Sequence, residues 1–289
     1  MLENELSTAI SLARLAGDTI LKHYAVGFVA EEKIGADNLG EPVTIADREA
    51  SQLIVDGLRA SFPDDAVLSE EEPDDIQRRL RKDRVWIIDP MDGTAGFIKG
   101  DGDFGVQIGL AQAGIPVLGI VFLPYYNLLS YGVKEMGAFS EPQSGDRIQL
   151  STSTILEFGN MDLAVSRNHL SPRMNRIIEH FGFRNVTRRG SVGLKTGLIA
   201  DRSCDIYIHP SPRTKLWDTC APQAILEAAG GRLTDMFGYD IRYDAADLQN
   251  HNGILATNGT SHGYVLDHLL PLLEEFGRTS HPAIRKTAV

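Results

Sequence analysis

Apolar residues recur at steps of three and four in the first part of the chain, a pattern that predicts amphipathic helices. One apolar stripe runs from about residue 3 to residue 24 and predicts a helix that packs one face inward. A second helical pattern runs from Ile45 to about Ser61, with Asp47 in its first turn and Phe62-Pro63 as its stop.

The pattern changes to short β-rich runs between residues 67 and 140. Strands are predicted at residues 85–88, 104–111, 117–123 and 128–133. Turns that contain glycine, proline and asparagine separate three of these runs, so neighbouring strands in a meander are expected.

Strand and helix patterns alternate after a polar loop at residues 141–146. Strands are predicted at 162–166, 185–188, 205–208 and 232–234, and helices at 172–181, 191–200, 217–229 and about 261–276. This alternation predicts a layered αβ architecture. We take the loop as the boundary between an N-terminal α+β half, residues 1–145, and a C-terminal α/β half, residues 146–289.

Composition places the chain among soluble proteins. Apolar residues make up 43% of it, and no apolar run reaches the roughly 18 to 20 residues that a membrane-spanning helix needs. The N-terminus lacks the basic start and apolar block of a secretory signal. We therefore expect a cytoplasmic protein with no membrane partner.

Charge and cysteine content exclude further classes. A net charge of −11 argues against a nucleic-acid polymer as partner, because such proteins need a basic surface to displace counterions. A small phosphorylated ligand remains compatible, since cations held by carboxylates can make a pocket positive. Cys204 and Cys220 are too few for a disulfide framework and too far apart for a CxxC site, so reduced structural thiols are expected.

The segment Asp89-Pro90-Met91-Asp92-Gly93-Thr94 carries the most chemical information. An apolar strand ends there in two aspartates, and Pro90 and Gly93 permit a tight turn that lets both carboxylates converge. Mg²⁺ prefers such oxygen ligands. The same composition is also typical of an ordinary surface turn.

Three more acidic positions stand beside predicted helices or strands. Glu70 follows the apolar run 66–68, Asp47 lies in the first turn of a helix, and Asp218 precedes another apolar helical run. Each also has an ordinary explanation, either as a solvated acidic surface or as a favourable acid at a helix N-terminus.

The order of these motifs resembles the inositol monophosphatase superfamily over nearly the whole chain. The matching segments are Pro42-Val43-Thr44-x-x-Asp47, Ser69-Glu70-Glu71, Asp89 to Thr94, and Trp217-Asp218. The resemblance implies a layered α-β-α-β-α sandwich of the α+β class and a metal-dependent phosphomonoesterase that lithium inhibits.

The resemblance also implies two to three Mg²⁺ ions. Glu70, Asp89 and the carbonyl of Met91 would hold one ion, and Asp89, Asp92 and Asp218 a second. A third, weaker ion would lie near Glu70.

The catalytic residues implied are Asp47, Thr94 and Glu70, with Asp47 and Thr94 orienting the attacking water. Metals can bind the phosphate, activate water and stabilise the leaving alkoxide, so no covalent intermediate is needed. The backbone N–H groups of Gly93 and Thr94 would donate to phosphate oxygens if a helical turn begins there.

Residues 95–104 look most like the CysQ-type 3′(2′),5′-bisphosphate nucleotidase branch. Residues 42–44, 67–71 and 190–195 match it too. Two positions depart from the branch, because Ala95 stands where lysine is common and Cys220 where alanine is usual. The implied reaction is hydrolysis of adenosine 3′,5′-bisphosphate to AMP and phosphate.

A nucleoside bisphosphate needs a second anion site. Besides Gly93, Thr94 and Asp218, the residues expected to contact substrate are Ser191, Lys195 and Arg213, with Lys215 beside them. The three basic residues are equally typical of solvated surface side chains. Ser191 is equally typical of a helix N-cap. The roles of His169 and His209 stay open.

Other interpretations of the substrate and of the function remain. Inositol-1-phosphate, histidinol phosphate and fructose 1,6-bisphosphate are alternative substrates, and a non-catalytic phosphate-binding regulator is an alternative of another class. A homodimer is expected from the resemblance.

Overall fold

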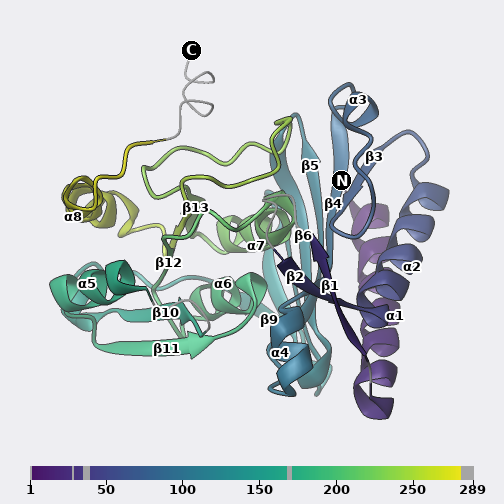
Figure 1. Ribbon diagram of the computed structural model, residues 1–289, viewed down its shortest axis with the longest axis horizontal. Helices are drawn as coiled ribbons and strands as arrows, with labels where there is room; N and C mark the ends of the chain where they lie inside the picture. The colour runs from purple at the N-terminus through teal and green to yellow at the C-terminus, as the bar shows by residue number, and fades with distance from the viewer. Residues whose placement is uncertain (1, 28, 35–39, 168–170, 281–289) are drawn as a thin grey trace.

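The computed structural model describes residues 2–27, 29–34, 40–167 and 171–280 (Figure 1). Its α-helices are α1 (Glu3–Val26), α2 (Ile45–Ser61), α3 (Ile76–Arg79), α4 (Thr94–Lys99), α5 (Pro172–Phe181), α6 (Val192–Ala200), α7 (Leu216–Ala228) and α8 (His262–Glu275). Every helix expected from the sequence is present within a few residues of its predicted bounds. The short helix α3 was not predicted, and α4 is the helical turn at Thr94 on which the expected phosphate contacts depend.

Two of the sheets carry most of the strands. The first contains β3 (Ala66–Ser69), β4 (Arg84–Asp92), β5 (Gly105–Gln112), β6 (Ile115–Leu123), β7 (Leu128–Val133), β8 (Gly137–Glu141) and β9 (Ile148–Leu150), in that order. The second has the order β11 (Asn185–Arg189), β10 (Asp162–Ser166), β12 (Ile206–His209), β14 (Ile254–Thr257) and β13 (Arg232–Thr234). A separate hairpin pairs β1 (Ala30–Ile34) with β2 (Gly40–Thr44).

The pairing confirms the predicted meander, because β5, β6 and β7 follow one another in antiparallel register. Strands β1, β2, β8, β9 and β14 were not predicted. Strand β9 lies beyond residue 145 yet completes the first sheet. The division into two halves at that residue therefore stays a prediction.

Helices and sheets alternate in five layers (Figure 1). Helices α1 and α2 cover one face of the first sheet and bury Ala9, Ala13, Ile20 and Ile54 against it. Helices α6 and α7 lie between the two sheets, and α5 and α8 pack on the outer face of the second. The expected α-β-α-β-α sandwich is confirmed.

A row of glycines sets how closely α7 approaches the first sheet. Gly109, Gly119 and Gly132 are paired across β5, β6 and β7. A Cβ at Gly119 would lie 2.2 Å from the carbonyl oxygen of Ala221, and one at Gly132 would lie 2.6 Å from the Cα of Ile225. The backbone of α7 thus rests directly on the sheet, which fixes where its N-terminus lies.

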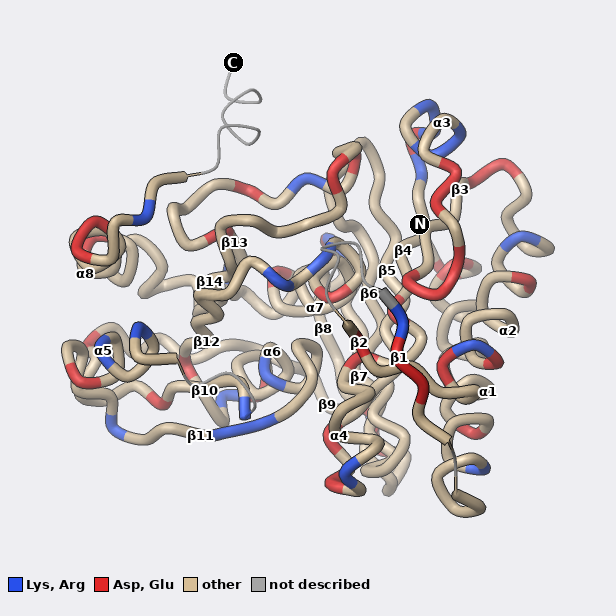
Figure 2. The backbone as a smooth tube through the Cα atoms, in the orientation of Figure 1, with Lys and Arg blue, Asp and Glu red and all other residues tan. Residues whose placement is uncertain are grey.

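Charged residues are scattered over most of the elements, and the basic stretch along β11 stands out (Figure 2). Among the described residues, no helix combines the length and apolarity that crossing a membrane would require.

Candidate active site

The parallel pairing of β3 with β4 brings two acidic residues to one edge of the first sheet. Ser69 pairs with Ile88, and the backbone N–H of Glu70 donates to the carbonyl of Ile88 at 3.1 Å. Glu70 and Asp89 each follow one member of this pair. Their nearness is therefore set by strand register, since sequence separates them by 19 positions.

The end of β4 bends so that a second aspartate joins the first. The pairing with β5 shifts register between Asp89 and Asp92, and the backbone N–H of Met91 donates to Asp89 Oδ1 at 3.0 Å. Gly93 then takes a φ of +96°, and a Cβ there would lie 2.4 Å from the carbonyl oxygen of Asp103. Only glycine fits this turn without strain.

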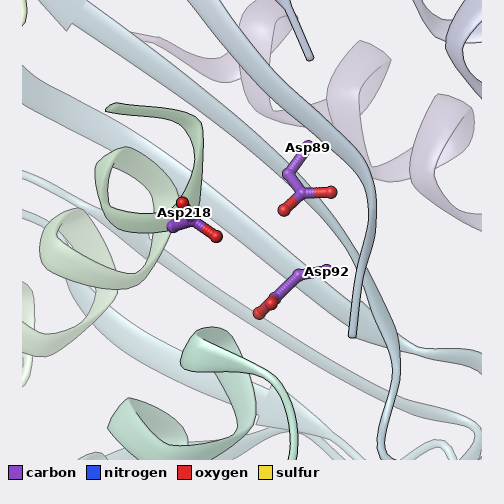
Figure 3. A group of neighbouring side chains, drawn as sticks. All are labelled: Asp89, Asp92 and Asp218. Carbon is purple, nitrogen blue, oxygen red and sulfur yellow. The ribbon is translucent and has the colours of Figure 1, made fainter. Parts of the chain in front are cut away.

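Asp218 reaches the same point from the first turn of α7. Its Oδ2 accepts a hydrogen bond of 2.6 Å from the backbone N–H of Lys215, which fixes the side chain at the helix start. Carboxylate oxygens of Asp89, Asp92 and Asp218 lie within 4.8 Å of one another (Figure 3). The structure thus brings together three of the four acids that we expected to meet.

The electrostatics of these three carboxylates fit a bound divalent cation. Burial, followed by repulsion from the neighbouring acids, raises the pKa of Asp89 and of Asp218 well above its ordinary value. Burial also raises the pKa of Asp92. Hard oxygen donors this close together repel one another until a cation such as Mg²⁺ or Ca²⁺ compensates them, so the donor set suits such an ion.

Glu70 lies outside that set of three. Lys33, on β1, donates to Glu70 Oε1 at 2.8 Å and also forms a short contact with Glu71. These two glutamates raise the pKa of Lys33, which keeps the ammonium charged. Glu70 lines the same cavity as the aspartates, and its role as a ligand stays a prediction.

Thr94 and Asp47 form the pair expected from the sequence motifs. The hydroxyl of Thr94 lies 2.9 Å from Asp47 Oδ1 and 3.2 Å from the carbonyl oxygen of Met91. The backbone N–H and the hydroxyl of Thr44 both donate to Asp47 Oδ2 at 2.7 Å, so the buried carboxylate is held from two sides. The oxygen of Thr94 can therefore accept a hydrogen bond from a donor in the cavity.

These groups open into a cavity of about 520 Å³. The second half of the chain contributes Ser191, Lys195, His209 and Arg213 to its wall. The hydroxyl of Ser191 donates to Asp92 Oδ2 at 2.6 Å, and its oxygen caps α6 by accepting from the N–H of Leu194. The N-cap explanation of Ser191 is thus confirmed, together with a contact that sequence reasoning did not foresee.

Lys195 and Lys215 are both buried and use most of their N–H donors in hydrogen bonds within the protein. Lys195 is buried, donates to the carbonyls of Gly190 and Ser191, and lies over the ring of Tyr207. Two of its three N–H donors are used, and burial lowers its pKa to about 8. Lys215 is also buried, and its ammonium contacts Glu41 and a backbone carbonyl. One N–H donor of Lys195 is left for substrate after its two carbonyl contacts.

The remaining candidates have simpler outcomes. His209 is buried at the end of β12 beside the cavity, and His169 lies outside the described residues. Both cysteines are buried, as expected for structural thiols, and Cys220 packs against Gly109.

Sequence reasoning missed Lys33 and Gln107. Gln107 is fully buried in β5 and contacts Asp92. A single glutamine inside the apolar run Val106 to Leu110 was the available signal, since a buried polar residue needs a partner. Lys33 carried no comparable signal, because its partners Glu70 and Glu71 come from another part of the chain.

The raised pKa values predict an unusual pH dependence for the metal-free protein. An acid whose pKa is raised by folding binds more protons in the folded than in the unfolded protein. The free energy of unfolding therefore falls as the pH rises above 3.8, the ordinary pKa of an aspartate. We expect Mg²⁺ to raise the melting temperature more at pH 8 than at pH 5. Thermal unfolding with and without the ion measures this, and an equal rise at both pH values would contradict it.

The sequence is similar to known phosphatases over most of its length. The model of the inositol monophosphatase family matches residues 1–274. The 3′(2′),5′-bisphosphate nucleotidase CysQ of Escherichia coli (strain K12) is 36% identical over 238 residues, which cover 82% of this chain and 93% of that protein. A fructose-1,6-bisphosphatase/inositol-1-monophosphatase of Thermotoga maritima is 31% identical over 278 residues, or 95% of this chain and 99% of that protein.

Solved structures agree with these matches. CysQ from Bacteroides thetaiotaomicron superposes with a TM-score of 0.73 and 31% identity, over 89% of this chain and 98% of that one. The IMPase of Thermotoga maritima gives a TM-score of 0.78 with 27% identity, over 95% and 100% of the two chains.

Proposed function

Because the chain belongs to the inositol monophosphatase family, we propose that it is a 3′(2′),5′-bisphosphate nucleotidase that hydrolyses adenosine 3′,5′-bisphosphate to AMP and phosphate. Membership of this family makes it a phosphatase, and 36% identity to CysQ supports the choice of substrate. The observation that carries the chemistry is the meeting of Asp89, Asp92 and Asp218 beside the Thr94 and Asp47 pair.

Mg²⁺ is the cation that we assign to the site, as two to three ions. Asp89, Asp92 and Asp218 would hold it, and Glu70 with the carbonyl of Met91 would extend the set. When bound, the metal would neutralise the phosphate charge, acidify a water molecule and stabilise the leaving alkoxide.

The chain's own residues orient the nucleophile. The Thr94 hydroxyl donates to Asp47 or to the Met91 carbonyl, so its lone pairs can accept a hydrogen bond from a water in the cavity. That contact would hold the water with an oxygen lone pair toward the phosphorus. Asp47 would act through Thr94, because Asp47 is buried and accepts a hydrogen bond from the Thr94 hydroxyl, and Thr94 lines the cavity.

The phosphate would be bound where α4 begins. Gly93 is the N-cap of α4 and Thr94 its first residue, and the first N–H groups of a helix have no partner within it. Both residues line the cavity, where these donors would bind phosphate oxygens without adding charge.

The second phosphate of the substrate would lie against the residues that the second half of the chain contributes to the cavity. Arg213 lines the cavity there and carries a fork of donors suited to phosphate. Lys195 has one N–H donor left after its two carbonyl contacts, and Ser191 stands between it and Asp92. We assign the outer phosphate to Arg213 first and Lys195 second.

Substrate profiling tests the proposal. We expect kcat/KM for phosphate release from adenosine 3′,5′-bisphosphate to exceed that from inositol-1-phosphate by about tenfold or more, since about 1.4 kcal/mol from one added phosphate contact suffices. Fructose 1,6-bisphosphate and histidinol phosphate should be measured alongside. Fructose 1,6-bisphosphate is the more informative of the two, because the chain is 31% identical to the fructose-1,6-bisphosphatase/inositol-1-monophosphatase of Thermotoga maritima. The reverse ranking would reject the nucleotide substrate while leaving the phosphatase chemistry intact.

Inhibition by Li⁺, a homodimer and a cytoplasmic location accompany the proposal as predictions. No turnover of any phosphate ester in the presence of Mg²⁺ would instead favour the phosphate-binding regulator.

A further inference from the structure

Gln107 is a buried polar residue on the face of β5 that points toward α6 and α7. Its side chain is fully excluded from solvent. In the register of β4 and β5 it stands opposite Asp89, and opposed residues of antiparallel strands share a face of the sheet. Because β4 shifts register before Asp92, the amide Nε2 of Gln107 instead donates to Asp92 Oδ2.

Two more donors converge on the same oxygen of Asp92. The hydroxyl of Ser191 donates to it at 2.6 Å and the backbone N–H of Gly193 at 3.0 Å. A Cβ at Gly193 would lie 3.0 Å from a methyl carbon of Val121 and 3.3 Å from the Cδ of Gln107, so glycine leaves room for this close approach. Three donors from β5 and the start of α6 thus enclose one oxygen and fix the rotamer of Asp92.

The other end of the same amide has no partner. Gln107 Oε1 is a buried side-chain oxygen without a hydrogen bond among the described residues. Rotating the amide by half a turn would not help, because it would set that oxygen against the Asp92 carboxylate and remove a donor. A buried unsatisfied carbonyl costs free energy that an apolar side chain of the same shape would avoid.

We propose that Gln107 is a positioning residue that locks Asp92 Oδ2, so that the other oxygen of Asp92 is presented to a divalent cation together with Asp89 and Asp218. The unsatisfied Oε1 of Gln107 is then the consequence of placing its Nε2 donor beside Asp92. This inference rests on the proposed metal-dependent function and names a residue that supports one of its ligands. Outer contacts of this kind orient the ligands of metal sites generally.

The test uses Gln107→Met, which keeps the length and roughly the volume of the side chain and removes the donor. We expect the dissociation constant for Mg²⁺ or Mn²⁺, measured by calorimetry without substrate, to rise about 10- to 100-fold. The melting temperature of the metal-free variant should change little, because losing the unsatisfied carbonyl offsets losing one of the three donors to Asp92. At saturating metal, kcat should stay within about threefold.

Gln223→Met is the matched control. Gln223 is a buried glutamine on α7 whose partners are Tyr243 and Glu227, away from the aspartates. We expect its replacement to lower the melting temperature and leave the metal dissociation constant unchanged. Gln107→Leu repeats the comparison with a second apolar side chain in case methionine packs poorly.

The outcomes separate the inference from the function on which it rests. If wild-type protein binds the metal and Gln107→Met binds it equally well, the positioning role is overturned and the phosphatase proposal stands. A lower melting temperature with unchanged metal affinity would make Gln107 a purely structural residue. If the wild type binds no divalent cation, both proposals fail.

Discussion

Replacing Asp89 by asparagine is expected to reduce phosphatase activity by about a thousandfold or more. Asp89 is the carboxylate that the proposed ions would share, and metal stabilisation of the transition state is worth several kcal/mol, where about 1.4 kcal/mol corresponds to a factor of ten. The fold should survive, because the asparagine oxygen can still accept the hydrogen bond that Met91 donates to Oδ1.

Stability should move in the opposite direction to activity. Burial and the neighbouring acids raise the pKa of Asp89, so its charged form is unfavourable without a metal. The metal-free variant should therefore melt at or above the wild-type temperature at pH 8, and its gain on adding Mg²⁺ should shrink. These quantities come from phosphate-release kinetics and thermal unfolding.

Asp18→Asn supplies the control. Asp18 is exposed on α1, which lies on the other face of the first sheet, so the same change of charge there should leave activity and metal response unaltered. Turnover retained by Asp89→Asn would remove the metal assignment altogether.

Replacing Gly119 by alanine should destabilise the protein and weaken the site together. The added Cβ would meet the carbonyl oxygen of Ala221 at 2.2 Å, so α7 must move away from the sheet. Overpacking of this kind costs about 1 to 3 kcal/mol, and a clash with backbone belongs at the upper end. Because Asp218 lies in the first turn of α7, a shift of about 1 Å there should lower activity by about 100-fold.

Gly197→Ala is the matched control for that substitution. Gly197 lies inside α6, and nothing stands within 4 Å of the position that a Cβ would take. Alanine there should stabilise the helix by about 0.5 to 1 kcal/mol and leave Mg²⁺ affinity unchanged. The glycine row would lose its assigned role if Gly119→Ala melted and bound Mg²⁺ like the wild type.

Local sequence patterns predicted the elements well where a single physical rule governed them. The apolar stripe of α1 and the stop after Ser61 follow from helical periodicity and from proline. Strands β1, β2 and β14 were missed for different reasons. The first two form a mainly polar hairpin with little apolar alternation, and β14 is a short run whose partners β12 and β13 come earlier in the chain.

The candidate site divides in the same way. Asp89 and Asp92 lie three positions apart, so the turn chemistry of Pro90 and Gly93 was enough to predict that their carboxylates converge. Asp218 could be added only through the order of motifs along the chain. Lys195 shows the limit of that reasoning, since its charge was visible in the sequence but its burial against the ring of Tyr207 was not.

Local patterns along the chain were enough to predict the helices, the meander and the local pair of aspartates, because each depends on residues that are close together in the sequence. The tertiary structure decided that Asp218 lies beside that pair, that Lys33 contacts Glu70 and that Gln107 holds Asp92. Those contacts depend on strand register and on how closely α7 rests on a row of glycines, and both are set by packing between segments that are far apart along the chain.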